Sequence, residues 1–341
     1  MPQLTGFGRY VIRRLLLLVP LLFGITVLCF FLVRLSDVNP ATLIAGPTAG
    51  QVEIESVEEE LGLGEPLVTQ YWIYLRGALT GDLGESWVTQ RPVGSELAER
   101  LPITLELVTL SVLAAAVIGI AVGFVSAMNQ NGLADHGLKA YTLVGVSMPV
   151  FWLGLLLIFV FFYVLGVAPA PTGRLDLFIS APEPITNAPL LDSLLRRDVE
   201  AAQSILGHMV LPAAALTLTA GSAIAKQSRS AIIEIRFSPR VRYARACGLP
   251  QLQVWRLILH NALPSIITFV AIDYSFALGG SALIEIIFSW GGLGQFGVNA
   301  ITRADYAVVQ AFVLTMGVLA SFIYLVSDLV VAAIDPRVSY R

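Results

Sequence analysis

Residues 241–250 read VRYARACGLP, a short basic segment in a chain that is otherwise mostly apolar. Ser238 and Pro239 precede the segment. These residue types begin helices, because serine accepts bonds from free backbone N–H groups and proline fits the first helical position. Gly248 suits the left-handed conformation that follows a helix end. The pattern predicts a short helix over residues 239–247, between much longer apolar segments.

The predicted helix has features of a surface that binds another protein. Arg242 and Arg245 are three residues apart and share one face of the helix. Ala244, Ala246 and Gly248 carry little or no side chain, so another backbone or a partner's groove can approach closely. The alternative interpretation is a basic loop that only sets membrane topology. Such a loop does not need a helix with marked ends and a small-residue face.

The composition of the chain is that of a membrane protein. Of its 341 residues, 56% are hydrophobic and 13% are charged, and the mean hydropathy is +0.77. Soluble domains carry about 25% charged residues. The net charge of −3 argues against a nucleic-acid binder, which is expected to be basic. Cys29 and Cys247 form neither a disulfide framework nor a metal-binding motif.

A bilayer core requires about 20 mostly apolar residues per helix. Arg13 and Arg14 precede the first apolar stretch as in a signal peptide. However, residues 15–33 carry no charge, which is longer than a usual signal core, and no A-x-A cleavage site follows. We therefore interpret this stretch as a retained span. The sequence predicts an all-α polytopic membrane protein, with a single domain over residues 1–341 and spans at about 12–34, 103–128, 140–166, 209–226, 262–288 and 308–334.

The positions of lysine and arginine predict the orientation, because basic residues concentrate in cytoplasmic segments. With the N-terminus inside, the inner segments hold 13 of the 21 basic residues, whereas loop 35–101 carries eleven acidic residues and three arginines. Both termini and the segment 227–261 are therefore expected in the cytoplasm. Within that segment, a second helix is expected from Pro250 toward Asn261. The inner basic residues are Arg9, Arg13, Arg14, Lys139, Lys226, Arg229, Arg236, Arg240, Arg242, Arg245, Arg256, Arg337 and Arg341.

Two long loops are expected outside. Loop 35–101 contains an acidic cluster at residues 58–60 and an aromatic run at 71–75, so short helices near the membrane surface are predicted. Loop 167–208 contains five prolines and is expected to be extended or turn-like. Loops of this length are commonly functional, and the acidic loop is the candidate surface for an external partner.

No catalytic, cofactor or metal site is predicted. Residues 292–297 fit the pattern GxGxxG, but they follow an apolar helix instead of a strand, so a turn is expected. Lys139 and Lys226 are the only lysines, and neither follows a glycine, so the chain has no phosphate-binding loop for ATP hydrolysis. The three histidines lie in different segments and have no neighbouring ligand set for zinc.

Four acidic residues lie in or near the expected spans, where charges are costly and often functional. Asp273 and Glu285 belong to the fifth span, Glu106 lies near the outer end of the second, and Asp328 lies near the inner end of the sixth. Asp273 and Glu285 are separated by about 18 Å along a helix, too far for one acid–base pair. They are candidates for a water-filled passage or for pairing between helices. An intramembrane enzyme, which needs such a pair, is not supported.

Residues 242–248, RYARACG, resemble the coupling motif E-A-A-x-x-x-G of the permease subunits of ATP-binding-cassette importers. The A-R-A-x-G-L form of the peptide and nickel branch matches from Ala244 to Leu249. The chain is similar over nearly its whole length to the B-type permease subunits for dipeptides and oligopeptides. The other matching pieces are Arg13-Arg14, ELGL (60–63) with Pro66, GDLGES (81–86), RLPITLE (100–106), SMP (147–149) with Gly154, Gly173, His208 with Leu211-Pro212, Glu285, FSW (288–290) with GLG (292–294), Asp305-Tyr306 and Asp335-Pro336-Arg337.

The chain departs from the family pattern at two places. The family's P-G-D-P-A after the first span is replaced by SDVNPA at residues 36–41. Of the H-x-x-x-N that follows the coupling glycine, only Asn261 is present, with Leu257 in place of the histidine. These positions bear on the substrate class and on the docking surface.

The resemblance implies a type I importer permease in the plasma membrane of a prokaryote, with a cytoplasmic coupling helix and no cofactor of its own. The implied partners are a second, C-type permease, two ATP-binding subunits that hold ATP and Mg²⁺, and an external substrate-binding protein. The expected substrate is a dipeptide or short oligopeptide. Alternatives are a permease of the same family for nickel, haem or glutathione, and a membrane sensor or scaffold without transport. The implied coupling residues are Arg242, Tyr243, Ala244, Arg245, Ala246 and Gly248.

Overall fold

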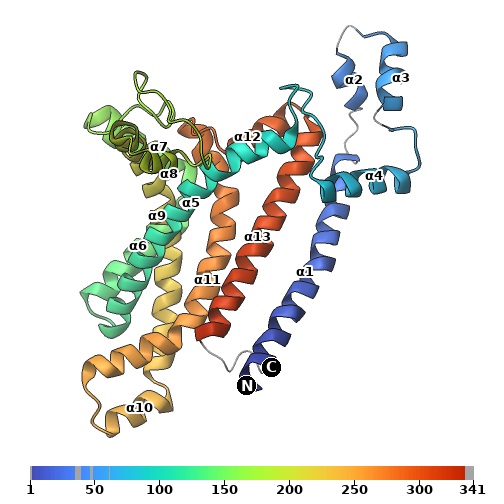
Figure 1. The fold of residues 1–341 in the computed structure, drawn as a ribbon. Helices are drawn as coiled ribbons and strands as arrows, with labels where there is room; N and C mark the ends of the chain where they lie inside the picture. The colour runs from blue at the N-terminus through green and yellow to red at the C-terminus, as the bar shows by residue number, and fades with distance from the viewer. Residues whose placement is uncertain (1, 35–39, 47–48, 61, 335–341) are drawn as a thin grey trace.

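The computed structural model describes residues 2–34, 40–46, 49–60 and 62–334, and helices dominate it (Figure 1). These ranges contain no strand, which confirms the all-α fold. The departure at residues 36–39, the motif at 335–337 and the basic residues Arg337 and Arg341 lie outside the described residues. The helices are α1 (Pro2–Arg34), α2 (Pro40–Ala45), α3 (Gln51–Glu60), α4 (Leu67–Thr80), α5 (Val93–Met128), α6 (Leu133–Ser147), α7 (Val150–Leu157), the π-helix η1 (Ile158–Val164), α8 (Pro189–Arg196), α9 (Val199–Arg236), α10 (Pro239–Ala246), α11 (Gln251–Ile287), α12 (Leu293–Thr302) and α13 (Tyr306–Ile334).

Among the described residues, five helices are long and apolar enough to cross a membrane, namely α1, α5, α9, α11 and α13. The expected span at residues 140–166 is not one helix, because α6 and the pair of α7 and η1 meet at an angle of 103°. Pro149 restricts the preceding Met148 to an extended conformation, with φ −94° and ψ 123°, so α6 ends at Ser147. The sequence did not reveal the break, because apolar composition continues through it. Counted as one broken span, the bent pair brings the candidate spans among the described residues to the expected six.

The other expected spans lie inside longer helices. Residues 103–128 belong to the 36-residue α5, which begins at Val93, inside the expected loop 35–101. Residues 209–226 belong to the 38-residue α9, and residues 262–287 belong to the 37-residue α11. The second helix predicted after Pro250 is therefore the start of α11, which continues into the span instead of ending near Asn261. The loop expected over residues 167–208 ends earlier than predicted, because α8 and the first turns of α9 occupy its second half.

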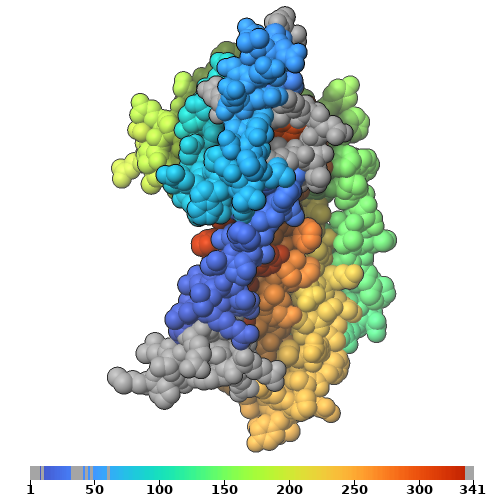
Figure 2. Space-filling model, turned by 90° about the vertical axis from the view of Figure 1, so that its right-hand side faces the viewer, coloured from blue at the N-terminus to red at the C-terminus, as the bar shows by residue number. Residues whose placement is uncertain are grey.

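The helix α10 lies at one end of the bundle, together with the start of α1 and the end of α13 (Figure 1). The helices α2, α3, α4, α8 and α12 lie at the opposite end. The helix α1 crosses the outside of the bundle obliquely (Figure 2). It is joined to α13 by an ion pair of 3.0 Å between Arg14 and Asp328, and to α4 by a hydrogen bond of 2.8 Å between the Thr26 and Tyr71 hydroxyls.

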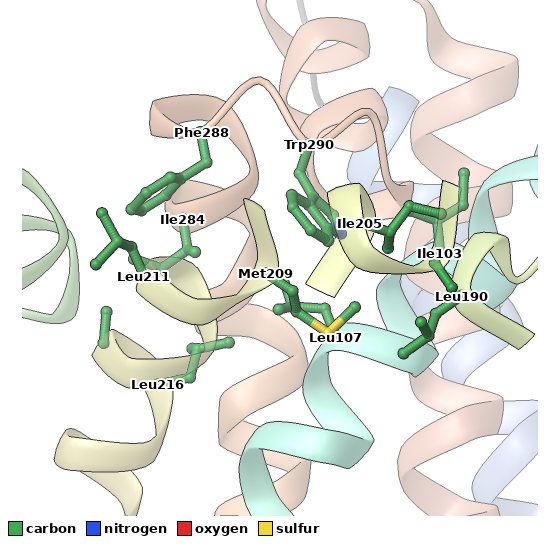
Figure 3. Packing of buried hydrophobic residues seen from close by; sticks show 12 residues of the cluster. Ile103, Leu107, Leu190, Ile205, Met209, Leu211, Leu216, Ile284, Phe288 and Trp290 are labelled. Carbon is green, nitrogen blue, oxygen red and sulfur yellow. The ribbon is translucent and has the colours of Figure 1, made fainter. Parts of the chain in front are cut away.

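The helices α5 and α9 pack closely because glycines let their backbones meet. A Cβ on Gly123 would lie 2.6 Å from the carbonyl oxygen of Ala225, and a Cβ on Gly119 would lie 2.9 Å from that of Gly221. Small residues serve this purpose between membrane helices. A buried hydrophobic cluster around Trp290 adds contacts among α5, α8, α9 and the end of α11 (Figure 3). These contacts hold the frame that carries α10.

Candidate functional site

The basic segment forms helix α10, which has a well-defined end. The Leu249 N–H donates to the Ala244 carbonyl at 3.2 Å, and the Gly248 N–H donates to the Arg245 carbonyl at 3.0 Å. This pair of bonds is the Schellman motif, which needs a left-handed residue after the helix. Gly248 supplies it with a φ of 74°. The helix ends one residue before the predicted boundary, and the glycine has the predicted conformation.

The start of α10 differs from the prediction. Ser238 occupies the N-cap position, but its side chain makes no capping hydrogen bond. Instead, the Arg240 guanidinium donates to the Asn261 side-chain oxygen on α11. The Asn261 amide in turn donates to the Leu257 carbonyl at 2.6 Å. The asparagine retained from the family pattern therefore ties the two helices together, a role that sequence reasoning missed.

The two faces of α10 have different environments. Val241 and Ala244, three residues apart, are 0% and 7% exposed, and Val241 belongs to a buried cluster with residues of α5, α9 and α11. Ala244 therefore contacts this chain, contrary to the expectation that it lies open to a partner. The opposite surface, here called the α10 face, contains the exposed residues Arg242, Tyr243, Arg245, Ala246 and Gly248.

A buried ion cluster fixes the turn between α5 and α6 to α9. The Asp135 carboxylate accepts hydrogen bonds from Arg229 Nε at 2.6 Å and from Ser126 Oγ at 2.7 Å, and Lys139 Nζ lies 3.1 Å away. The Asp135 side chain is 0% exposed. Arg236 also donates to a carbonyl in the last turn of α5 at 2.6 Å. Sequence reasoning missed this cluster, because 94 residues separate Asp135 from Arg229.

Two of the four acids noted in the sequence bind the first turns of short helices. The Glu285 carboxylate accepts from Thr104 Oγ1 at 2.6 Å and from the Gln295 backbone N–H of α12 at 2.8 Å. The Glu106 carboxylate accepts from two backbone N–H groups of α8 at 2.9 and 3.1 Å. Carboxylates stabilise helix N-termini through the helix dipole and the free N–H groups. With Asp328 bound to Arg14, three of the four acids have partners within the chain.

The sequence predicts a turn at residues 292–297, the GxGxxG segment. In the structure this segment begins α12. Gly292 is the N-cap residue, and the other residues of the motif form the first turns. A Cβ on Gly292 would lie 2.5 Å from Thr104 Oγ1 and 2.7 Å from a Glu285 carboxylate oxygen. The glycine is needed because α12 starts directly against these two side chains.

The loop before α8 is held by a further carboxylate. Asp192 accepts from the Thr186 hydroxyl at 2.7 Å and from the Thr186 backbone N–H at 2.8 Å. Burial raises the pKa of Asp192, but the hydrogen bonds from Thr186, Ile185 and Asn187 outweigh burial and hold this pKa below its ordinary value. The proline-rich segment is therefore pinned at its end by an ionised side chain.

Asp273, the fourth acid, lines a cavity of about 390 Å³ between the α6–α7 bend, α9 and α11. Its Oδ2 is buried and has no hydrogen-bond partner among the described residues. The rest of the lining is mostly apolar. It includes Met148 and Pro149 at the bend, Leu216 and Thr219 of α9, and Phe276 of α11.

The cavity results from the way α6 meets α9. The Tyr141 hydroxyl donates to the Leu218 carbonyl at 3.0 Å. One turn further on, Gly145 lies so close to α9 that a Cβ would overlap the Ser222 side chain. The helix α6 is thus held on α9 up to the bend. After Pro149 the chain changes direction by 103°, and the cavity lies beside the bend.

Two models of transport-protein families match the chain. One describes the inner membrane component of binding-protein-dependent transport systems and matches residues 119–340. The other describes the N-terminal part of such a membrane component and matches residues 7–108.

Several curated proteins are similar to the chain over nearly its whole length. The dipeptide transport system permease protein DppB of Alkalihalophilus pseudofirmus is 37% identical over 335 residues, which is 97% of this chain and 99% of that protein. The di/tripeptide transport system permease protein DppB of Pseudomonas aeruginosa has the same identity and coverage. The glutathione transport system permease protein GsiC of Escherichia coli is 34% identical, again over 97% of this chain and 99% of that protein.

The fold is similar to that of a solved transporter structure. A chain of the inward-facing MetNI methionine ABC transporter superposes with a TM-score of 0.50 at 20% sequence identity. The match covers 70% of this chain and 95% of that chain. At this identity, the likeness concerns the fold alone.

Proposed function

This chain belongs to the family of inner membrane components of binding-protein-dependent transport systems, and we propose that it is the permease subunit of an importer for dipeptides or short oligopeptides. The proposal depends chiefly on the 37% identity to dipeptide and di/tripeptide permeases over 97% of the chain. The five long helices and the bent pair supply the membrane-crossing frame that such a subunit needs. In this proposal the chain forms half of the translocation pathway, and a second, C-type permease forms the other half.

The α10 face is the proposed contact with a separate ATP-binding subunit. Arg242 and Arg245 offer positive charge to acidic groups of that subunit, and Ala246 and Gly248 allow its surface to come close. Tyr243, which is 74% exposed, adds apolar area to the same contact. ATP and Mg²⁺ are bound by the partner, since this chain has no phosphate-binding loop.

The connections of α10 suit it to transmit movement. Residues 237–238 join α9 to α10, and residues 247–250 join α10 to α11, so two long helices lead directly into it. On its other face Ala244 is buried, and Val241 packs in a cluster with residues of the same two helices. A push on α10 by closing ATP-binding subunits therefore moves α9 and α11 with it, and we propose that this rigid-body movement switches the access of the pathway.

The proposed orientation places the α10 end in the cytoplasm, because the basic residues concentrate there. Both termini are then cytoplasmic, and α2, α3, α4, α8 and α12 face outward. The helix α3 carries exposed glutamates at positions 53, 55 and 59, which make it the proposed contact for the external substrate-binding protein.

Reconstitution tests the proposal. The chain is purified with its C-type permease, ATP-binding subunits and binding protein, and ATP hydrolysis and uptake are measured in proteoliposomes across dipeptides, tripeptides, glutathione, nickel and haem. Dipeptides and short oligopeptides are expected to stimulate both activities. Stimulation by glutathione alone would support the alternative suggested by the 34% identical relative. An assembled complex that no substrate stimulates would contradict transport and favour a sensor or scaffold.

A further inference from the structure

Asp273 differs from the other acids of the spans in having an unsatisfied carboxylate oxygen. Glu106 and Glu285 bind helix N-termini, and Asp328 binds Arg14. The Asp273 Oδ2 has no hydrogen-bond partner among the described residues, and no ion pair within these residues involves its carboxylate. The described residues therefore supply no donor to this oxygen, and a ligand could supply one.

The position of Asp273 makes an unpaired carboxylate costly. The residue lies eleven positions into the expected span 262–288, about 16 Å along the helix, and hence near the middle of the membrane. Charged groups at this depth face a cavity or a partner, because exposure to lipid is strongly unfavourable. The cavity beside the α6–α7 bend supplies the space that a donor needs.

The size and lining of the cavity suit a small zwitterion. Its volume of about 390 Å³ lies within the range of about 300–1,000 Å³ of small-molecule sites. Met148, Leu216 and Phe276 offer apolar surface that can contact different side chains of a bound peptide. Asp273 provides the one acidic group in the lining. A carboxylate attracts an ammonium group and repels another carboxylate, so it orients a peptide by its N-terminus.

On the premise that the proposed function is correct, we infer that Asp273 binds the α-ammonium group of the peptide as it passes through the permease. The interaction recognises a group that every unmodified dipeptide carries, while the apolar lining tolerates different side chains. The two carboxylate oxygens exchange by rotation about the last side-chain bond, so the buried Oδ2 can turn toward the ligand.

A thiol reporter in the cavity tests this inference without the binding protein, whose own selectivity would otherwise mask that of the permease. Ala223 lines the cavity from α9, so Ala223→Cys places the reporter thiol there. Cys247→Ser is introduced with it to remove the exposed native thiol. Cys29 is buried and stays unchanged. Labelling of this reporter by a water-soluble maleimide is measured in the complex of permeases and ATP-binding subunits. The probes are a free dipeptide and its N-acetylated form, which lacks the ammonium charge.

The free dipeptide is expected to slow labelling. The N-acetylated form is expected to need at least about tenfold higher concentration for the same protection, because it loses a charge-assisted hydrogen bond to Asp273. Asp273→Asn is expected to remove this difference, whereas Asp273→Glu retains it. Glu200→Gln, which neutralises an exposed acid at the outer start of α9, is the charge-matched control and is expected to behave as wild type.

Three results would overturn the inference. The first is equal protection by both peptides, and the second is an Asp273→Asn variant that still distinguishes them. The third is loss of the C-type permease on purification of Asp273→Asn, which would show that Asp273 pairs with a cation of that subunit. Each result is interpreted only after wild-type proteoliposomes import the dipeptide, since failure of that uptake contradicts the proposed function itself.

Discussion

Replacing Gly248 by valine tests whether the end of α10 joins the membrane helices to the ATP-binding subunit. Gly248 has a φ of 74°, and the two hydrogen bonds that close α10 depend on this conformation. Apart from Gly248 and its two chain neighbours, no atom of the described residues lies within 4 Å of the position that a Cβ would take at Gly248. In the isolated subunit, a side chain at position 248 therefore strains the backbone conformation and does not clash with a neighbouring residue.

The size of the effect follows from that geometry. Left-handed backbone costs a residue with a Cβ about 1–2 kcal/mol, and a β-branched residue is especially unsuited to it. This cost shifts the balance between the closed and the opened helix end by about 5- to 30-fold. The packing of Val241 and the bond between Arg240 and Asn261 still anchor α10. The variant is therefore expected to fold and insert, while the end of α10 loses its fixed conformation.

The assay compares peptide uptake with ATP hydrolysis in proteoliposomes. Gly248→Val is expected to keep hydrolysis and to import at least about fivefold fewer peptides per ATP, in line with the shifted helix end. Gly248→Asn is the matched control, because asparagine adopts the left-handed conformation more readily, and it is expected to retain more coupling. A Gly248→Val complex that imports the wild-type number of peptides per ATP would refute the role assigned to this helix end.

Three further substitutions test the contacts that support the site. Asp135→Ala removes the carboxylate that pairs with Arg229 and is expected to lower the free energy of unfolding by about 3 kcal/mol. This is the low end for a buried pair, because the Arg229 side chain is 26% exposed. An unchanged melting temperature would contradict this expectation. Glu285→Gln keeps an acceptor but loses the charge at the start of α12, so it is expected to cost about 1 kcal/mol; Glu285→Ala is expected to melt at a lower temperature still. Gly123→Leu is expected to prevent the close contact of α5 and α9, so that little folded subunit is recovered from membranes. Gly137→Ala, where a Cβ meets no described atom within 4 Å outside its own stretch of α6, is the control and is expected to add about 0.5–1 kcal/mol of helix stability.

Local signals in the sequence were sufficient for α10. Proline at its start and glycine after its end act through their own backbone conformations, so its bounds were predicted to within one residue. The break at Met148 and Pro149 had the same kind of local signal, but the apolar run on both sides concealed it. Hydropathy measures transfer into the bilayer and does not register a change of direction in the backbone.

The acids of the spans show the limit of sequence reasoning. Composition identified Glu106, Asp273, Glu285 and Asp328 as charges that needed an explanation, since each lies among apolar residues. Which of them had partners depended on residues far away in the chain. Thr104, for example, is 181 positions from Glu285, and only the packing of α5 against α11 brings the two side chains to 2.6 Å.

The sequence by itself determined the membrane class, the apolar segments, the short basic helix and the resemblance to importer permeases. These depend on local composition and on residue types at fixed spacing. The tertiary structure alone decided that Ala244 packs inward, that Glu285 stabilises the start of α12, and that one carboxylate oxygen of Asp273, beside a bend, has no hydrogen-bond partner among the described residues. The physical reason is that burial and hydrogen bonding belong to pairs of groups, and the folded chain determines which groups meet.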